Sequence, residues 1–375
     1  MADWFDKRRE AQARAYDRSQ GRLFLLRFAL LFVLAAAFWM SGLSRALAAG
    51  LRGWFSFPFA WPLVSITFTA LAVFGYEVIL FPLSVLADFS MERAHGRHHE
   101  DFGVWLRGFL VTMVLEIGLV TGAFTGFYLL MRLFPAYWWL AVTGIYAVFV
   151  AGVGEWGPAR LLPRVRPPVP SGDAALEEEL RRLGRKAGLD IQDAAWWHFE
   201  HQEDLEPVRL TGAGRRRRVV FTERAWQQMG HREKVFLAAR QMALVQAGPA
   251  IGLQAFQVAL AGSALFGTAK LTEWAARHQG LSGAVAPEAF PFLVACLFAL
   301  AALAGVAAHA TVRRAELRAD RFALRHAGGP EVLQSCLRQE FDLEPFAVDA
   351  PVWQVLLLRR MPTAAQRLAR AAPGT

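Results

Sequence analysis

The fold is decided by one helical stretch, Arg232-Glu-Lys-Val-Phe-Leu-Ala-Ala-Arg-Gln-Met-Ala-Leu-Val-Gln-Ala247. It contains neither Gly nor Pro, and its apolar residues recur at helical spacing, which predicts a helix with one buried face. Gly248-Pro249 follows directly and is a common helix stop. A second helix is predicted at Arg313-Arg-Ala-Glu-Leu-Arg-Ala-Asp-Arg-Phe-Ala323, where Glu316 and Asp320 lie one turn apart on the same face. We expect these two helices to form the active site of the chain, or to be the place where an ancestral active site has been lost.

Composition indicates a membrane protein. The chain has 375 residues, 55% of them hydrophobic, and the apolar residues collect in runs of roughly twenty, the length that spans a bilayer as a helix. The net charge of +9 fits a membrane protein with basic cytoplasmic parts. A nucleic-acid-binding protein would also be basic, so charge alone does not decide between these classes. The two cysteines provide no disulfide framework, and the charged segment before the first long apolar run argues against a cleavable signal peptide.

The apolar runs predict about six spans: Leu23–Met40, Leu63–Leu86, Phe109–Met131, Tyr137–Val153, Ile251–Ala269 and Pro291–Val312. They divide the chain into five parts: 1–22, a cytoplasmic N-terminal helix; 23–156, transmembrane helices 1–4; 157–248, a cytoplasmic domain; 249–312, a transmembrane helical pair; and 313–375, a cytoplasmic helical tail with Glu316 and Asp320. Lys and Arg gather in the soluble parts, which places those parts and both termini in the cytoplasm. Richness in Ala, Arg, Gly and Leu favours a bacterial source.

The cytoplasmic domain is predicted to be small and α+β. The segment from Asp173 to Gly188 is predicted to be a surface helix. Its Glu residues lie near the N-terminal end and its Arg and Lys residues near the C-terminal end, as the helix dipole favours. The best strand candidates are Ala194–Phe199 and Arg218–Thr222, with a hairpin connection beginning at Thr211. The Pro-rich segment Leu162–Pro170 reads as an extended linker, and the four arginines of 215–218 as a solvated loop tip.

The order of these parts resembles the integral-membrane CAAX prenyl protease family, whose members are zinc metallopeptidases of the gluzincin type. The similarity covers roughly residues 60–370 and is most specific in two motifs, Arg313-Arg-Ala-Glu-Leu-Arg-Ala-Asp and Met361-Pro-Thr-Ala-Ala-Gln-Arg367. Weaker likeness lies in Ile79-Leu-Phe-Pro-Leu-Ser, Phe89-Ser-Met-Glu-Arg-Ala-His-Gly-Arg and Trp105-Leu-Arg-Gly. The resemblance implies a mainly α polytopic membrane protein of about six to seven spans that enclose a chamber, with a small α+β metallopeptidase-like cap at 157–248.

Most metal-binding atoms of the family are missing here. The two zinc-binding histidines of its His-Glu-x-x-His motif fall on Ala239 and Ala243, whose methyl groups have no lone pair. The general-base glutamate falls on Arg240, and the histidine that steadies the oxyanion falls on Met361. The third ligand, Glu316, is present, as are Asp320, which in the family orients a ligand histidine, and Arg367. Zinc is the family's cofactor, and we expect this chain not to bind it.

The pattern of loss suggests a structural substitute for the metal. Arg240 stands where the family's residue points toward zinc, so its guanidinium is expected near Glu316 as a fixed cation in place of Zn²⁺. The alternative is that Arg240 points into cytoplasmic water. The predicted function is then a catalytically inactive pseudoprotease that binds a hydrophobic peptide, a lipid or a membrane-protein segment, or that regulates an active partner. Membrane lipids are expected partners, and nucleic acid is not favoured.

Two alternatives remain open at this point. One is an active metallopeptidase whose metal site is rebuilt from Glu316 with His198, His201 or His231; the other is a lipid-handling or transport protein that uses the chamber as a passage. Glu77, Glu116 and His309 lie within or near predicted spans, where ionisable groups usually face a cavity or each other, so they are candidate chamber residues. A cytoplasmic loop also gathers His95, His98 and His99, which are read as a solvated interfacial turn.

Overall fold

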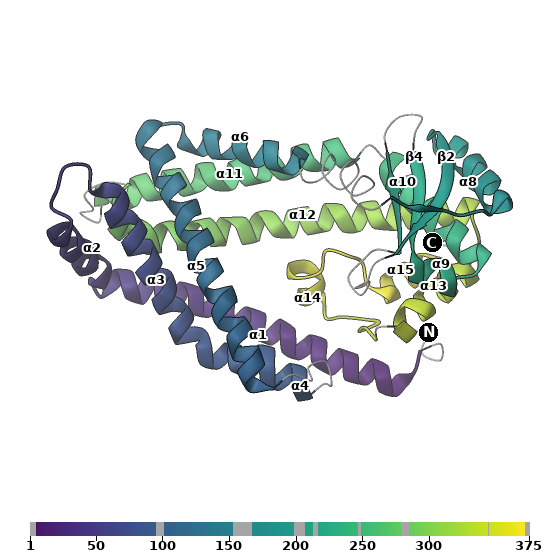
Figure 1. Ribbon diagram of the computed structural model, residues 1–375, viewed down its shortest axis with the longest axis horizontal. Helices are drawn as coiled ribbons and strands as arrows, with labels where there is room; N and C mark the ends of the chain where they lie inside the picture. Colours follow the sequence, from purple (N-terminus) through teal and green to yellow (C-terminus); the bar gives the residue numbers. More distant parts are fainter. Residues whose placement is uncertain are drawn as a thin grey trace. The chain divides into compact units, whose positions relative to one another are not determined.

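The computed structural model describes residues 5–94, 101–152, 167–198, 207–212, 217–246, 249–278, 285–343 and 345–371 (Figure 1). The chain divides into two compact units. One contains 1–17, 146–259 and 305–375, and we call it the cap unit; the other contains 18–145 and 260–304, and we call it the helical unit. Three long helices, α1 (Lys7–Met40), α11 (Pro249–His278) and α12 (Phe290–His326), each run from one unit into the other.

The helical unit contains most of the apolar helices. Four helical segments of the described chain are long and apolar enough to cross a membrane: Lys7–Met40, Trp61–Met91, Phe102–Leu133 and Pro287–His326. They include α1, α3 (Trp61–Ser84) with the π-helical turn η1 (Val85–Met91), α5 (Phe102–Leu133), and the short helix η4 (Pro287–Ala289) with α12. The shorter elements are α2 (Leu43–Trp54), α4 (Glu92–Ala94) and α6 (Trp138–Ala151), of which α6 is apolar. The expected polytopic helical fold class is confirmed.

Two helices continue across the boundaries drawn from composition. The N-terminal helix expected at 1–22 and the first span form the single helix α1, and the helix expected from Arg313 is the end of α12. Neither junction contains a proline or a capping sequence that would end the helix. Gly21 lies buried inside α1 and does not break it. The change from apolar to charged residues therefore does not mark a break in the helical backbone.

The cap unit is built on a four-stranded sheet of order β1-β2-β4-β3. Its strands are β1 (Val169–Pro170), β2 (Ile191–Trp197), β3 (Val208–Thr211) and β4 (Arg217–Thr222). The central strands β2 and β4 are parallel, and the outer strands β1 and β3 pair antiparallel to β2 and β4. Both predicted strands are found. The Pro-rich linker is partly corrected, because its last two residues form the edge strand β1, where a proline removes no ladder bond from a central strand.

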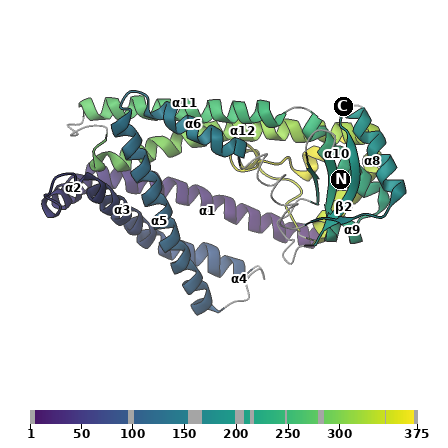
Figure 2. The same cartoon turned by 45° about the horizontal axis from the view of Figure 1, so that its top comes forward.

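Helices pack on the sheet and complete the core of the cap unit. Helix α8 (Ala174–Lys186) packs on β2 (Figure 2), and α10 (His231–Gln246) packs on α8, on β3 and on α13 (Pro330–Leu343). The remaining helices are α9 (Glu223–Gln228), α14 (Val352–Leu357) and α15 (Ala364–Ala371). Fully buried apolar side chains from these elements, such as Leu180, Phe221 and Phe236, form one hydrophobic cluster.

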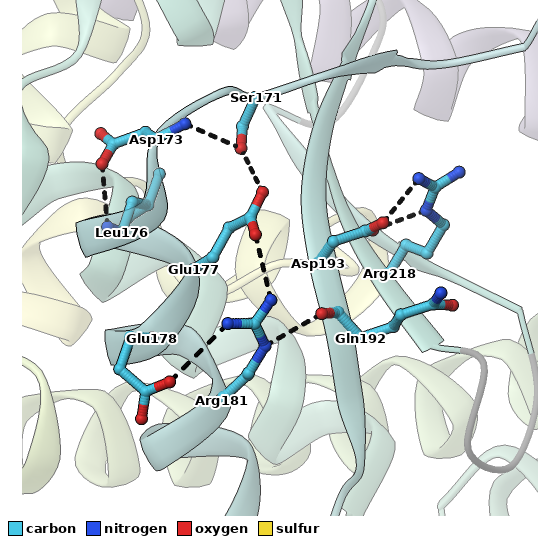
Figure 3. A network of polar contacts seen from close by, with 9 residues as sticks. All are labelled: Ser171, Asp173, Leu176, Glu177, Glu178, Arg181, Gln192, Asp193 and Arg218. Carbon is cyan, nitrogen blue, oxygen red and sulfur yellow. Dashed lines mark hydrogen bonds and ion pairs between the residues drawn. The ribbon is translucent and has the colours of Figure 1, made fainter.

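A polar network fastens α8 to the sheet, and Figure 3 shows it. Asp173 caps the helix by accepting from the Leu176 amide at 3.0 Å, as its side chain and position predict. Arg181 donates to the Gln192 carbonyl at 3.0 Å, which ties the exposed side of α8 to β2. Arg218 makes two 2.6 Å bonds to Asp193 between the parallel strands. The interpretation of Arg218 as part of a solvated loop tip is therefore wrong, because it lies in β4 and is ion-paired.

Candidate functional site

The candidate site lies within the cap unit, where α10, α12 and α15 meet. Helix α10 turns Phe236, Ala239, Met242 and Ala243 inward, and all four are buried. Ala239 and Ala243 are one turn apart, so they present two methyl groups where the resemblance places two ligand histidines. Arg240 lies next to them at the edge of this buried face, with its side chain 15% exposed.

The guanidinium of Arg240 reaches two carboxylates of α12. Its Nε donates to Asp320 Oδ1 at 2.9 Å, and its Nη2 donates to Glu316 Oε2. Glu316 and Asp320 are one helical turn apart, so a planar guanidinium can bridge them with two of its donors. The expected contact between Arg240 and Glu316 is thereby confirmed, and the alternative that Arg240 points into water is wrong.

Arg367 also binds the carboxylate of Asp320. Its Nε donates to Asp320 Oδ2 at 2.9 Å and its Nη2 donates to Oδ1 at 3.1 Å, which is the bidentate geometry that suits arginine and carboxylate. The arginine is placed by helix α15, which begins with a reciprocal cap: Thr363 Oγ1 accepts from the Gln366 amide and Gln366 Oε1 accepts from the Thr363 amide, both at 3.2 Å. Asp320 therefore accepts hydrogen bonds from two different guanidinium groups.

The site is a buried cluster of two arginines and two acidic residues, so its formal charges balance. We call this set the charge cluster: Arg240, Glu316, Asp320 and Arg367. Glu316, Asp320 and Arg367 are at most 8% exposed, so each charge depends on its partners rather than on water. Burial alone would lower the pKa of Arg367, but its contacts with Asp320 raise that pKa above the ordinary value for arginine. The Arg367 guanidinium therefore stays charged.

The charge cluster does not offer the donor set of a catalytic zinc site. Such a site uses three protein ligands and leaves one position open for water. Here two ligand positions are the methyl groups of Ala239 and Ala243, and both carboxylates already accept from guanidinium groups. Among the residues that the structure describes, no three His, Cys, Asp or Glu side chains gather in a group that could hold a metal ion.

The segment before α15 differs from the family site in one further way. Met361 stands where the resemblance places the histidine that steadies the oxyanion; it is 43% exposed, and a thioether donates no hydrogen bond. The backbone beside it is held by the cap unit, because Arg313 Nη1 donates to the Arg359 carbonyl at 2.6 Å. Arg313 precedes Glu316 by one turn of α12, so the same helix positions both this segment and the charge cluster.

The other candidate residues lie elsewhere. His198 contacts Glu223 and His231 contacts Glu179 at 2.7 Å, while His201 lies outside the described residues, as do His95, His98 and His99. Of the chamber candidates, Glu77 on α3 and Glu116 on α5 belong to the helical unit and lie within electrostatic range of each other. His309 belongs to the section of α12 in the cap unit.

Two contacts beside the site were also not predicted from the sequence. Glu340 on α13 lies 4.0 Å from Arg367, and Ser335 on the same helix donates to Glu233 of α10 at 2.7 Å. The only available signal was the amphipathic pattern of 330–343, which predicts a helix but does not identify its partners.

Comparison with known proteins agrees with this architecture. Residues 1–154 match the family model of the CAAX prenyl protease N-terminal region, described as five membrane helices. The structure is similar to the crystal structure of S. mikatae Ste24p, with a TM-score of 0.70 and 15% sequence identity over 99% of this chain and 90% of that chain. No curated protein sequence matches the chain. At 15% identity the structural likeness establishes the fold, and the family model supports it over the membrane helices. The chain is an integral membrane protein with a Ste24p-like fold, and its N-terminal region is similar to that of the CAAX prenyl proteases.

Proposed function

We propose that this chain is a catalytically inactive pseudoprotease of the CAAX prenyl protease type, which does not bind zinc at the candidate site. One observation carries the proposal: the Arg240 guanidinium bridges Glu316 and Asp320, the two acidic positions retained from the family site. A carboxylate engaged by a guanidinium is a poor metal ligand, and an arginine cannot take a proton from water. Without a metal or a general base, the site lacks the means to activate water for peptide hydrolysis.

The function is then one of binding. The chain would hold a hydrophobic peptide, a lipid or a membrane-protein segment, or would regulate an active relative in the same membrane. The distribution of Lys and Arg supports a membrane location with the cap unit and both termini in the cytoplasm, and the richness in Ala, Arg, Gly and Leu supports a bacterial source. A rebuilt metal site is less well supported, because His198 and His231 each already contact another carboxylate.

Metal content of the purified full-length protein tests the proposal. We expect wild type to contain no stoichiometric zinc after purification in detergent with added zinc. The triple variant Ala239→His, Arg240→Glu, Ala243→His restores the family's ligands and base, and we expect it to bind about one zinc ion and to be stabilised by it, since a ligand that binds only the folded state raises its stability.

The double variant Ala239→His, Ala243→His is the matched control. It supplies both histidines but keeps Arg240 on Glu316, so we expect it to bind zinc far more weakly than the triple variant. Equal zinc binding by the double and triple variants would show that the guanidinium does not exclude the metal. One equivalent of zinc in wild type, with cleavage of a prenylated peptide that a chelator abolishes, would reject the pseudoprotease itself.

A further inference from the structure

The cap-unit end of α12 carries four exposed arginines on one face, Arg314, Arg318, Arg321 and Arg325, which we call the arginine stripe. Their spacing of four, three and four residues places them along the same side of a helix. In the described part of the chain, none of the four has an ion-pair or side-chain hydrogen-bond partner. This face of the helix therefore carries four uncompensated positive charges.

The opposite face of the same helix explains why the charges stay uncompensated. The acidic residues in this section are Glu316 and Asp320, and both are buried and bonded to Arg240. They are turned away from the stripe by the helical period, and their charges are already neutralised in the charge cluster. An acidic partner for the stripe must therefore come from outside these residues.

The position of the stripe relative to the apolar part of α12 identifies that partner. The helix is continuous from Phe290 to His326, and its first part belongs to a segment long and apolar enough to cross a membrane. With a rise of about 1.5 Å per residue, Arg314 and Arg318 follow Val312, the last residue of the span predicted from the sequence, by about 3 and 9 Å. The headgroup layer is roughly 5–7 Å thick on each side of a bilayer. Because helical side chains lean toward the N-terminus, these two arginines lean back toward the membrane.

A second feature of the cap unit lies beside the start of the arginine stripe. Helix α14 exposes Val352 (73%) and Leu356 (47%), although it lies outside the membrane-spanning segments. Its end is tied to the start of the stripe by the 2.6 Å bond from Arg313 to the Arg359 carbonyl. Exposed apolar side chains next to arginines are typical of segments that lie in the interface of a membrane.

We propose that the arginine stripe binds the phosphate groups of anionic phospholipids at the surface of the membrane that α12 crosses. Arginine forms bidentate hydrogen bonds with phosphate, and basic clusters that directly follow a transmembrane helix attract acidic lipids. The proposal does not depend on whether the charge cluster binds zinc. An acidic protein or a nucleic acid in solution would use all four arginines, whereas a bilayer favours the two nearest to it, Arg314 and Arg318.

Native mass spectrometry of the full-length protein in neutral detergent tests this assignment. Phosphatidylglycerol and phosphatidylcholine with identical acyl chains are titrated separately, and the dissociation constant of the first bound lipid is measured. We expect wild type to prefer phosphatidylglycerol. Each arginine near a charged surface contributes roughly fivefold in affinity, so the variant R314Q/R318Q should bind phosphatidylglycerol about thirtyfold more weakly.

The variant R321Q/R325Q is the matched control, with the same loss of charge on the same helix face but farther from the apolar span. We expect it to weaken binding by less than about fivefold. Both variants should keep the wild-type melting temperature, because none of the four side chains has an ion-pair or hydrogen-bond partner among the described residues. The assignment fails if R314Q/R318Q binds phosphatidylglycerol like wild type, or if wild type binds both lipids equally. It also fails if the two variants lose affinity equally, or if millimolar inorganic phosphate or an oligonucleotide displaces the lipid.

Discussion

Replacing Asp320 by asparagine tests how much the charge cluster stabilises the cap unit. The change keeps the shape of the side chain but removes the charge that accepts three hydrogen bonds, one from Arg240 and two from Arg367. Asp320 is 4% exposed, so water cannot take over the role of the carboxylate. Removing one partner from a buried ion pair costs about 3–5 kcal/mol, because the remaining charges stay buried. We expect Asp320→Asn to lower the free energy of unfolding by that amount.

The matched control is Asp193→Asn on the sheet. Asp193 also makes a bidentate contact with an arginine, at 2.6 Å for both bonds, but its side chain is 22% exposed and that of Arg218 is 33% exposed. Ion pairs that keep partial contact with solvent contribute less than buried ones, about 1 kcal/mol, so this variant should lose much less stability than Asp320→Asn.

Thermal unfolding of the detergent-solubilised protein separates the two cases. For a compact unit of about 200 residues, 1 kcal/mol shifts the melting temperature by about 2–4 °C. Asp320→Asn should therefore lower it by about 6–20 °C, and Asp193→Asn by no more than about 4 °C. If the two variants melt within a degree or two of each other, burial does not determine the strength of these contacts. If Asp320→Asn melts within a degree or two of wild type, the charge cluster does not stabilise the cap unit.

Two further outcomes follow from the structure. Gly184→Ala would place a methyl group 2.6 Å from Ile191 Cγ1 and 2.8 Å from a backbone carbonyl oxygen. Helix α8 must then shift from β2, and thermal unfolding should show that the free energy of unfolding falls by about 1–3 kcal/mol. The control is Gly108→Ala, whose new methyl group has nothing within 4 Å. Backbone hydrogen bonds from Arg9 and then Arg8 lower the pKa of Asp6 below its ordinary 3.8. The Asp6 carboxylate should therefore stabilise the first turn of α1 fully above pH 3.8. As the pH falls through the lowered pKa, the first turn should lose its protection from hydrogen exchange. Asp6→Asn should remove this pH dependence, and a first turn in wild type that opens already near pH 5 would contradict the assignment.

Local patterns predicted the elements of the cap unit, whereas most of its long-range contacts required the structure. The helix expected at 232–247 agrees with α10 to one residue at its start, and α10 is described as far as Gln246, because the helical spacing of apolar residues is a local signal. The contact between Arg240 and Glu316 was predicted only because the resemblance placed both residues at one site. The bidentate grip of Arg367 on Asp320 was not predicted, since periodicity does not report which side chains meet across 47 residues. The edge strand β1 was missed because its proline is unfavourable for a strand unless it lies at an edge.

Charge balance links the buried cluster to the metal experiment. In wild type the two guanidinium groups of Arg240 and Arg367 neutralise the carboxylates of Glu316 and Asp320, so the folded cap unit needs no additional cation. Arg240→Glu changes the cluster by two charges and leaves three carboxylates with one guanidinium, a net charge of minus two in a buried site. Such a charge must be compensated by a bound divalent ion or by protonation. The stability of the triple variant should therefore depend on zinc and on pH, whereas that of wild type should not change when a chelator is added. A wild-type protein whose melting temperature falls in the presence of a chelator would mean that a metal, and not Arg240, completes this site.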